Sequence, residues 1–128
     1  MAKLFGITFN ECKLTGSTFE QADLTSIVID GGDWSYVNLR HQELAGRVLK
    51  GLRLVNADLY ACDLRRVDFQ RADLSSASVG QIKLQGADLR GAILDGIDLA
   101  ALDLRGVKID LAQAIAVARA HGADVDLS

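Results

Sequence analysis

Residues 57–74 read Ala-Asp-Leu-Tyr-Ala-Cys-Asp-Leu-Arg-Arg-Val-Asp-Phe-Gln-Arg-Ala-Asp-Leu. An apolar residue occupies every fifth position of this stretch, at Leu59, Leu64, Phe69 and Leu74, and an aspartate precedes each of them. The same spacing runs from Leu4 to Ile109 without a break, over twenty-two positions of which fifteen are leucine. A fixed period over most of a chain is typical of repeat proteins.

A second, smaller residue lies two positions before many of these central residues. Alanine and cysteine hold this position at Ala22, Ala57, Cys62, Ala72, Ala77, Ala87 and Ala92. A period of five matches neither the 3.6 residues of a helical turn nor the two-residue alternation of a strand. The backbone must therefore turn a corner in each repeat while it returns both residues to the interior. This pattern predicts an all-β solenoid.

The Ala-Asp-Leu-x-x pattern resembles the pentapeptide-repeat proteins over about residues 2 to 110. The resemblance implies a right-handed quadrilateral β-helix in which four pentapeptides form one coil, so that residues twenty apart stack. Leu24, Leu44, Leu64 and Leu84 would then form one buried column. We expect a repeat domain at residues 1–110 and a separate C-terminal segment at residues 111–128, which begins with a short α-helix.

The repeat is irregular between Asp30 and Leu54. The small inward positions of this segment are held by Gly32, Val37, Gln42, Arg47 and Leu52. Burial of an unpaired amide or guanidinium costs free energy, so we expect the coil to bulge here or the two polar side chains to turn out to solvent. Two interpretations remain: a local irregularity packed around Trp34, or a bulge that contacts a partner.

The five-residue period ends at Ile109, and residues 111–121 are predicted to form a helix. Asp110 is a suitable N-cap, Gln113 stands at the capping-box position, and Gly122 is a suitable stop. Apolar residues at helical spacing would give this helix one apolar face. One role of such a helix is to close the open end of the solenoid.

The C-terminal segment resembles the Qnr and MfpA branch of the pentapeptide-repeat proteins. The resemblance rests on residues 106–110, the Gln113-Ala114 pair, the alanine-rich helix and His121-Gly122. It implies a symmetric homodimer. The residues shared between capping the coil and contacting the second copy would be Leu111, Ile115, Val117, Ala118 and Val125. The alternative is a segment that only caps the rod.

That branch binds type II DNA topoisomerases, DNA gyrase or topoisomerase IV, as an acidic rod that resembles duplex DNA, and it protects them from fluoroquinolones. The resemblance therefore implies the same function here, with an acidic partner-binding surface. Its candidate residues are Asp23, Glu43, Asp58, Asp63, Asp68, Asp73, Asp88, Asp98 and Asp103. The net charge is only −3 per chain. The alternative is a structural or scaffolding repeat domain in which these carboxylates bond to the turns.

Several function classes are disfavoured by the sequence. The two histidines, His41 and His121, lie far apart, and no phosphate-binding glycine loop or Cys/His metal cluster occurs, so we expect neither an enzyme nor a metal or cofactor site. A pI near 5.2 and few aromatic residues argue against direct nucleic-acid binding. No stretch is long and apolar enough for a membrane span, and we expect a cytoplasmic protein.

The two cysteines lie at inward positions of different columns. Cys12 and Cys62 are therefore expected to be buried, inert thiols rather than a disulfide or a metal pair.

Overall fold

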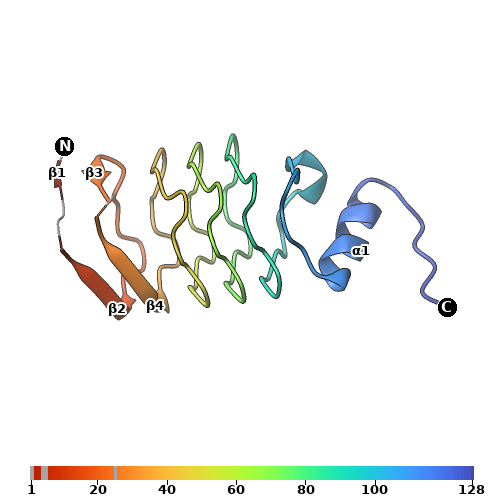
Figure 1. Cartoon of the computed structure of the whole chain (residues 1–128), viewed down its shortest axis with the longest axis horizontal. Helices are drawn as coiled ribbons and strands as arrows, with labels where there is room; N and C mark the ends of the chain where they lie inside the picture. Colours follow the sequence, from red (N-terminus) through yellow and green to blue (C-terminus); the bar gives the residue numbers. More distant parts are fainter. Residues whose placement is uncertain (1, 4–5, 25) are drawn as a thin grey trace.

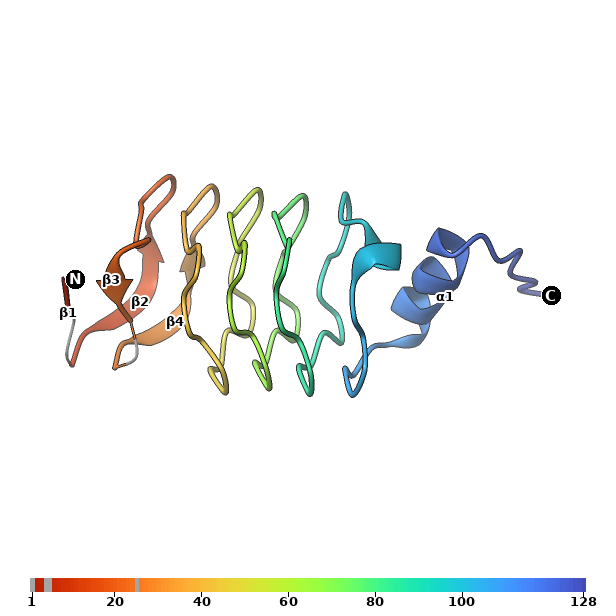
Figure 2. The same ribbon diagram turned by 90° about the horizontal axis from the view of Figure 1, so that it is seen from above.

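The computed structural model describes residues 2–3, 6–24 and 26–128, so Leu4 at the start of the apolar series lies outside the described residues. The chain winds into successive coils that stack along one axis and form a rod (Figure 1). The two ends of the chain lie at opposite ends of this rod, and Figure 2 shows the same stacking from above.

The first coils carry the four regular strands. These are β1 (Ala2–Lys3), β2 (Thr8–Lys13), β3 (Ala22–Asp23) and β4 (Val28–Asp33). β1 pairs with β3 and β2 pairs with β4, both in parallel. Thr8 lies opposite Val28 and Phe9 opposite Ile29, so the register is twenty residues.

The later coils continue this parallel ladder through isolated bridges. Glu43 pairs with Asp63, and Asp63 pairs with Lys83. The Leu64 N–H donates to the Lys83 carbonyl at 2.8 Å, and the Asp63 N–H donates to the Gln42 carbonyl at 3.0 Å. These pairs confirm the predicted stacking of residues twenty apart.

Most corners of the coils are β-turns closed by a backbone hydrogen bond. In one of them the Val67 N–H donates to the Leu64 carbonyl at 3.2 Å, while Arg66 takes a φ of 60°. A positive φ at the third residue of a turn suits glycine, which holds the equivalent place in other corners such as Gly46. The chain therefore tolerates L-residues in a strained conformation at several corners.

The core consists of the central and small inward residues. Leu24, Leu44, Leu64 and Leu84 are each at most 4% exposed, as the stacked column requires. At the N-terminal half, Trp34 is fully buried and its ring centroid lies 5.5 Å from those of both Phe9 and Phe19. The aromatic rings thus fill the wide interior of the irregular segment.

The thiols follow the prediction only in part. Cys62 is completely buried, and burial raises its pKa to about 11. Cys12 is only half-buried, and it belongs to β2, which lies near the N-terminal end of the rod (Figure 1).

Two helical elements end the rod. The short 3-10 helix η1 (Leu99–Ala101) lies in the last coil, and α1 (Leu111–Ala120) follows the final turn. The two helices contact each other, and α1 lies at the end of the rod in both views (Figures 1 and 2).

Candidate interaction surfaces

The C-terminal helix is fixed to the last coil by one buried amide. Asp110 and Gln113 form a complete capping box, as the sequence predicts. The Asp110 carboxylate also accepts from the Gly91 N–H at 2.8 Å, and these main-chain donors lower its pKa. The Gln113 side chain is 7% exposed and donates to the carbonyls of Leu89 at 2.5 Å and Ala92 at 2.9 Å.

The five residues predicted for a dimer interface have different environments in one chain. Leu111 is 77% exposed, whereas the other four, Ile115, Val117, Ala118 and Val125, are half-buried. Leu127 near the end of the chain is 66% exposed. The C-terminal end of the rod therefore presents apolar side chains that this chain alone does not cover.

The aspartates before the central residues bond to their own turns. In six members of the predicted acidic surface, one carboxyl oxygen accepts from the backbone N–H two residues later, for example in Asp63 from the Arg65 N–H at 3.2 Å. The same bond is made by Asp58, Asp68, Asp73, Asp88 and Asp103. These carboxylates thus stabilise the corners of the coil, as Asx turns do elsewhere.

Most of these aspartates also form ion pairs on the surface. Arginine two residues later holds Asp63 and Asp88 at 2.7 Å and Asp103 at 2.6 Å. Longer pairs join Arg40 to Asp58 at 3.7 Å, Lys50 to Asp68 at 3.5 Å and Arg53 to Asp73 at 3.7 Å. The predicted acidic surface is therefore interleaved with positive charge.

The remaining members of the acidic set differ from these. Asp23 also interacts with a neighbour. Within the described part of the chain, Glu43 and Asp98 are the members of the set that neither a turn bond nor an ion pair engages, and both are exposed.

The ion pairs change the acidity of the carboxyls. Arg90 donates to both oxygens of Asp88 and lowers the pKa of that carboxyl to about 2. Arg105 does the same to Asp103, whose pKa is also about 2. Counting acidic residues in the sequence missed this pairing, although the Asp-x-Arg spacing of residues 63–65, 88–90 and 103–105 signals it.

The two polar residues at small inward positions do not turn out to solvent, which corrects that part of the prediction. Gln42 is 6% exposed and its Nε2 donates to the carbonyls of Phe19 at 2.6 Å and Ala22 at 2.9 Å. Arg47 is half-buried and donates from Nη1 to the Ile27 carbonyl and from Nη2 to the Leu24 carbonyl at 2.6 Å. Paired in this way, both groups avoid the cost of burial.

The Arg47 side chain replaces a backbone bond of the ladder. Where the next coil stacks on this one, the regular backbone hydrogen bond runs from the Asp68 N–H to the Arg47 carbonyl at 2.9 Å. The equivalent donor to Ile27 would be the Val48 N–H, but the guanidinium occupies that carbonyl. In the described part of the chain, Val28 and Val48 form no bridge, and the N–H and carbonyl of Val48 make no hydrogen bond. The coil is thus open at this step.

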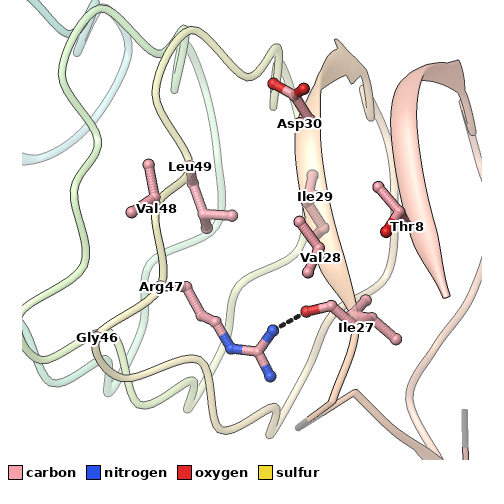
Figure 3. A pocket seen from close by; sticks show the side chains of 9 residues that line it. All are labelled: Thr8, Ile27, Val28, Ile29, Asp30, Gly46, Arg47, Val48 and Leu49. Carbon is pink, nitrogen blue, oxygen red and sulfur yellow. Dashed lines mark hydrogen bonds between the residues drawn. The ribbon is translucent and has the colours of Figure 1, made fainter. Parts of the chain in front are cut away.

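A pocket of about 410 Å³ occupies the open step (Figure 3). Its lining comes from β2, residues 27–30 and residues 46–49, and comprises Thr8, Ile27, Val28, Ile29, Asp30, Gly46, Arg47, Val48 and Leu49. The Arg47 guanidinium lies at one end of the pocket and Asp30 at the other. Val28 and Val48 are 55% and 61% exposed. The sequence signal for this pocket is Arg47, a charged residue at a small inward position.

Among residues 2–3, 6–24 and 26–128, no group of three or more His, Cys, Asp or Glu side chains could hold a metal ion. No helix in the described ranges has the length and apolar character needed to cross a membrane.

The family model for pentapeptide repeats matches eight copies in this chain, over residues 2–26, 44–81 and 82–114. The chain belongs to the pentapeptide-repeat family. Members of this family fold as right-handed quadrilateral β-helices and are in general interaction proteins rather than enzymes. The unmatched residues 27–43 of this pentapeptide-repeat protein include β4 and Gln42, whereas Arg47 and Val48 lie within the matched residues 44–81.

Solved structures of pentapeptide-repeat proteins superpose on this rod. A trypsin-treated R167E form of QnrB1, a plasmid-mediated fluoroquinolone resistance protein, matches 97% of this chain with a TM-score of 0.85 and 25% identity. The chain spans 60% of that structure's length. The alr5209 protein from Nostoc PCC 7120 matches 80% of this chain and 84% of its own, with a TM-score of 0.61 and 28% identity.

HetL, a regulator of heterocyst differentiation from the cyanobacterium Nostoc, gives a TM-score of 0.56 over 84% of this chain and 59% of its own. At 21% identity it supports the fold alone. Among curated proteins, no sequence matches this chain.

Proposed function

We propose that this pentapeptide-repeat protein is a non-catalytic rod that binds a type II DNA topoisomerase, DNA gyrase or topoisomerase IV, and protects it from fluoroquinolones. The observation that carries the proposal is the superposition on QnrB1, a fluoroquinolone resistance protein, at a TM-score of 0.85 over 97% of this chain. The two Nostoc proteins reach only 0.61 and 0.56 over smaller shares. A cytoplasmic setting is part of the proposal, because the topoisomerase acts on chromosomal DNA.

A homodimer is the second part of the proposal. The exposed side chains of Leu111 and Leu127 support an apolar contact at the C-terminal end of the rod. A two-fold axis there would bring the same surface of both copies together and bury Leu111. The half-buried Ile115, Val117, Ala118 and Val125 would complete the interface.

The ion pairs determine what kind of DNA mimic this rod can be. Arginines beside Asp63, Asp88 and Asp103 cancel much of the field that a row of carboxylates would produce. The net charge is −3 per chain and twice that for a dimer. Binding would therefore depend on the shape of the rod and on unpaired acids such as Glu43 and Asp98. We expect a weaker dependence on salt than that of duplex DNA.

A supercoiling assay with purified gyrase tests the proposal. The full chain is titrated with and without a fluoroquinolone. The test variant is Leu111→Asp, which changes an exposed residue of the proposed dimer interface and leaves the repeats intact. Inhibition of supercoiling, or protection from the drug, that weakens in Leu111→Asp supports a dimeric topoisomerase ligand. No effect at micromolar protein in either condition contradicts it.

The second candidate function is a scaffolding rod that binds another protein without topoisomerase activity. The turn bonds and ion pairs of Asp58, Asp63, Asp68, Asp73 and Asp88 favour it, because they give these carboxylates a structural role that needs no partner. A normal fold together with no effect on gyrase or topoisomerase IV would select this function.

A further inference from the structure

We propose that the pocket between β4 and residues 46–49 binds an extended peptide segment of a partner protein, with a carboxylate side chain held by Arg47. This inference rests on the interrupted ladder and is independent of the proposed topoisomerase function. It assigns a site to residues 27–30, which the family model does not match, and to the adjacent residues 46–49.

The main chain of the pocket supports a peptide as the ligand. The Val48 N–H and carbonyl make no hydrogen bond within the described ranges. On the other side, Val48 forms a parallel bridge with Asp68 through the main chain of Arg47 and Leu49, and Asp68 forms the next bridge with Asp88. Unpaired main-chain groups at a strand edge are satisfied when an extended segment adds to that edge. A peptide supplies both the donor and the acceptor that Val48 lacks.

The charges of the pocket determine where the acid lies. The Arg47 guanidinium has five N–H donors, and it donates hydrogen bonds to the main-chain carbonyls of Ile27 and Leu24. No carboxylate in the described part of the chain forms an ion pair with it. A carboxylate is the preferred partner of such a group. Asp30 at the opposite end disfavours a second acid there (Figure 3).

The apolar walls of the pocket favour an apolar residue next to the acidic residue of the bound peptide. Val28 and Val48 expose 55% and 61% of their surface, whereas the outward positions of the same face elsewhere hold Thr8, Asp68, Asp88 and Lys108. The volume of about 410 Å³ lies within the usual range of roughly 300 to 1,000 Å³ for ligand pockets. The expected ligand is an acidic residue followed by β-branched residues.

Peptide binding to the full chain tests the site. The probe is a fluorescein-labelled Glu-Val-Val-Ser tetrapeptide with blocked ends, followed by fluorescence anisotropy. Two matched peptides replace Glu by Lys or carry N-methyl groups on the valine amides. We expect at least tenfold weaker binding of both, since the first loses the ion pair and the second loses the backbone bonds.

Two protein variants complete the test. Arg47→Ala restores a small inward residue, so we expect the ladder to close, the Val48 amide to gain protection from hydrogen exchange, and peptide binding to be lost. Val48→Glu changes an exposed side chain and places an acid beside Arg47, which should block the peptide in a protein that folds normally. Arg65→Ala removes an equal charge elsewhere and should bind the peptide as the native chain does.

Four results would contradict the proposed peptide site. Equal binding of the three peptides, no binding at millimolar peptide, or unchanged binding by Arg47→Ala would overturn the proposal. Displacement of the peptide by equimolar acetate would also overturn it, since the pocket would then be a simple anion site.

Discussion

Gln113 donates from its side-chain nitrogen to the main-chain oxygen of Leu89 at 2.5 Å, across the junction between α1 and the last coil. The same nitrogen donates to Ala92 at 2.9 Å. Gln42 makes the equivalent pair of bonds inside the rod, to Phe19 and Ala22. One amide side chain thus donates to two carbonyls of a turn, both inside the rod and at its end.

Replacing Gln113 by leucine should destabilise the C-terminal end. The buried Ala92 carbonyl would lose its donor, while the Leu89 carbonyl would keep only the Ala92 N–H. We expect a loss of about 2 kcal/mol in the free energy of unfolding. Urea unfolding followed by circular dichroism measures this loss. Arg119→Leu, on the exposed side of α1, is the control and should change stability by no more than about 0.5 kcal/mol. Equal stability of the two variants would show that the amide does not fix the helix.

The inward orientation of the Leu64 side chain can be tested against the outward orientation of its neighbour, Asp63. Leu64 is 1% exposed, so Leu64→Lys places a charge in the buried column and should cost about 4 kcal/mol or more. Asp63→Lys changes an outward residue and should cost about 1 kcal/mol, because it removes one turn bond and one surface ion pair. Thermal unfolding compares the two, and a Leu64→Lys protein as stable as the native chain would invalidate the inward assignment.

Two glycines with a positive φ, one at a corner and one in β4, should respond differently to alanine. Gly46 has a φ of 75° with open space around its missing side chain, so Gly46→Ala should cost about 1 kcal/mol from backbone strain alone. Gly32 has a φ of 111°, and a Cβ there would lie 2.4 Å from the Cys12 carbonyl oxygen. Gly32→Ala should therefore lower the melting temperature far more, and similar melting temperatures would contradict the packing of β2 against β4.

Acid should weaken the rod through Asp88. Its pKa is about 2 in the folded chain against an ordinary value of 3.8, so its ion pair with Arg90 contributes stability above pH 4. That contribution is lost as the pH falls from about 4 to 2, because the unfolded chain binds the proton first. Carboxyl NMR titration should show the low pKa in the native chain and a value closer to 3.8 in Arg90→Gln. An unchanged titration in that variant would exclude Arg90 as the cause.

The two cysteines should differ in reactivity. Burial raises the pKa of Cys62 to about 11, and its side chain is completely covered, so it should not react with a disulfide reagent at pH 8. Cys12 is half-buried and should react. We expect one reactive thiol in the folded chain and two in urea, and Cys12→Ser should leave none before unfolding. Rapid reaction of both thiols would show that the coil around Cys62 opens.

The five-residue period was sufficient to predict the inward face, and the family resemblance added the stacking of residues twenty apart. Leu64 is buried, Asp63 pairs with Glu43 and Lys83, and Asp110 with Gln113 forms the capping box that the sequence predicts. These features depend on side-chain size and on local capping chemistry, both of which can be read from nearby residues in the sequence.

The partners of individual polar side chains could not be predicted in the same way. The sequence marks Arg47 and Gln42 as too large and too polar for their positions, but it does not show that the carbonyls of the preceding coil lie within their reach. Those carbonyls come from residues about twenty positions earlier. The same limit applies to Gln113, whose burial depends on where α1 meets the last coil.

The attachment of α1 has a consequence for the length of the rod. The segment that ends the stack recognises two carbonyls of one turn and a single glycine amide, through Gln113 and Asp110. Most coils present equivalent carbonyls at the same corner. A gene could therefore gain or lose whole coils upstream, twenty codons at a time, and keep the same terminal module, so that the size of such a protein can drift in evolution while its end stays constant.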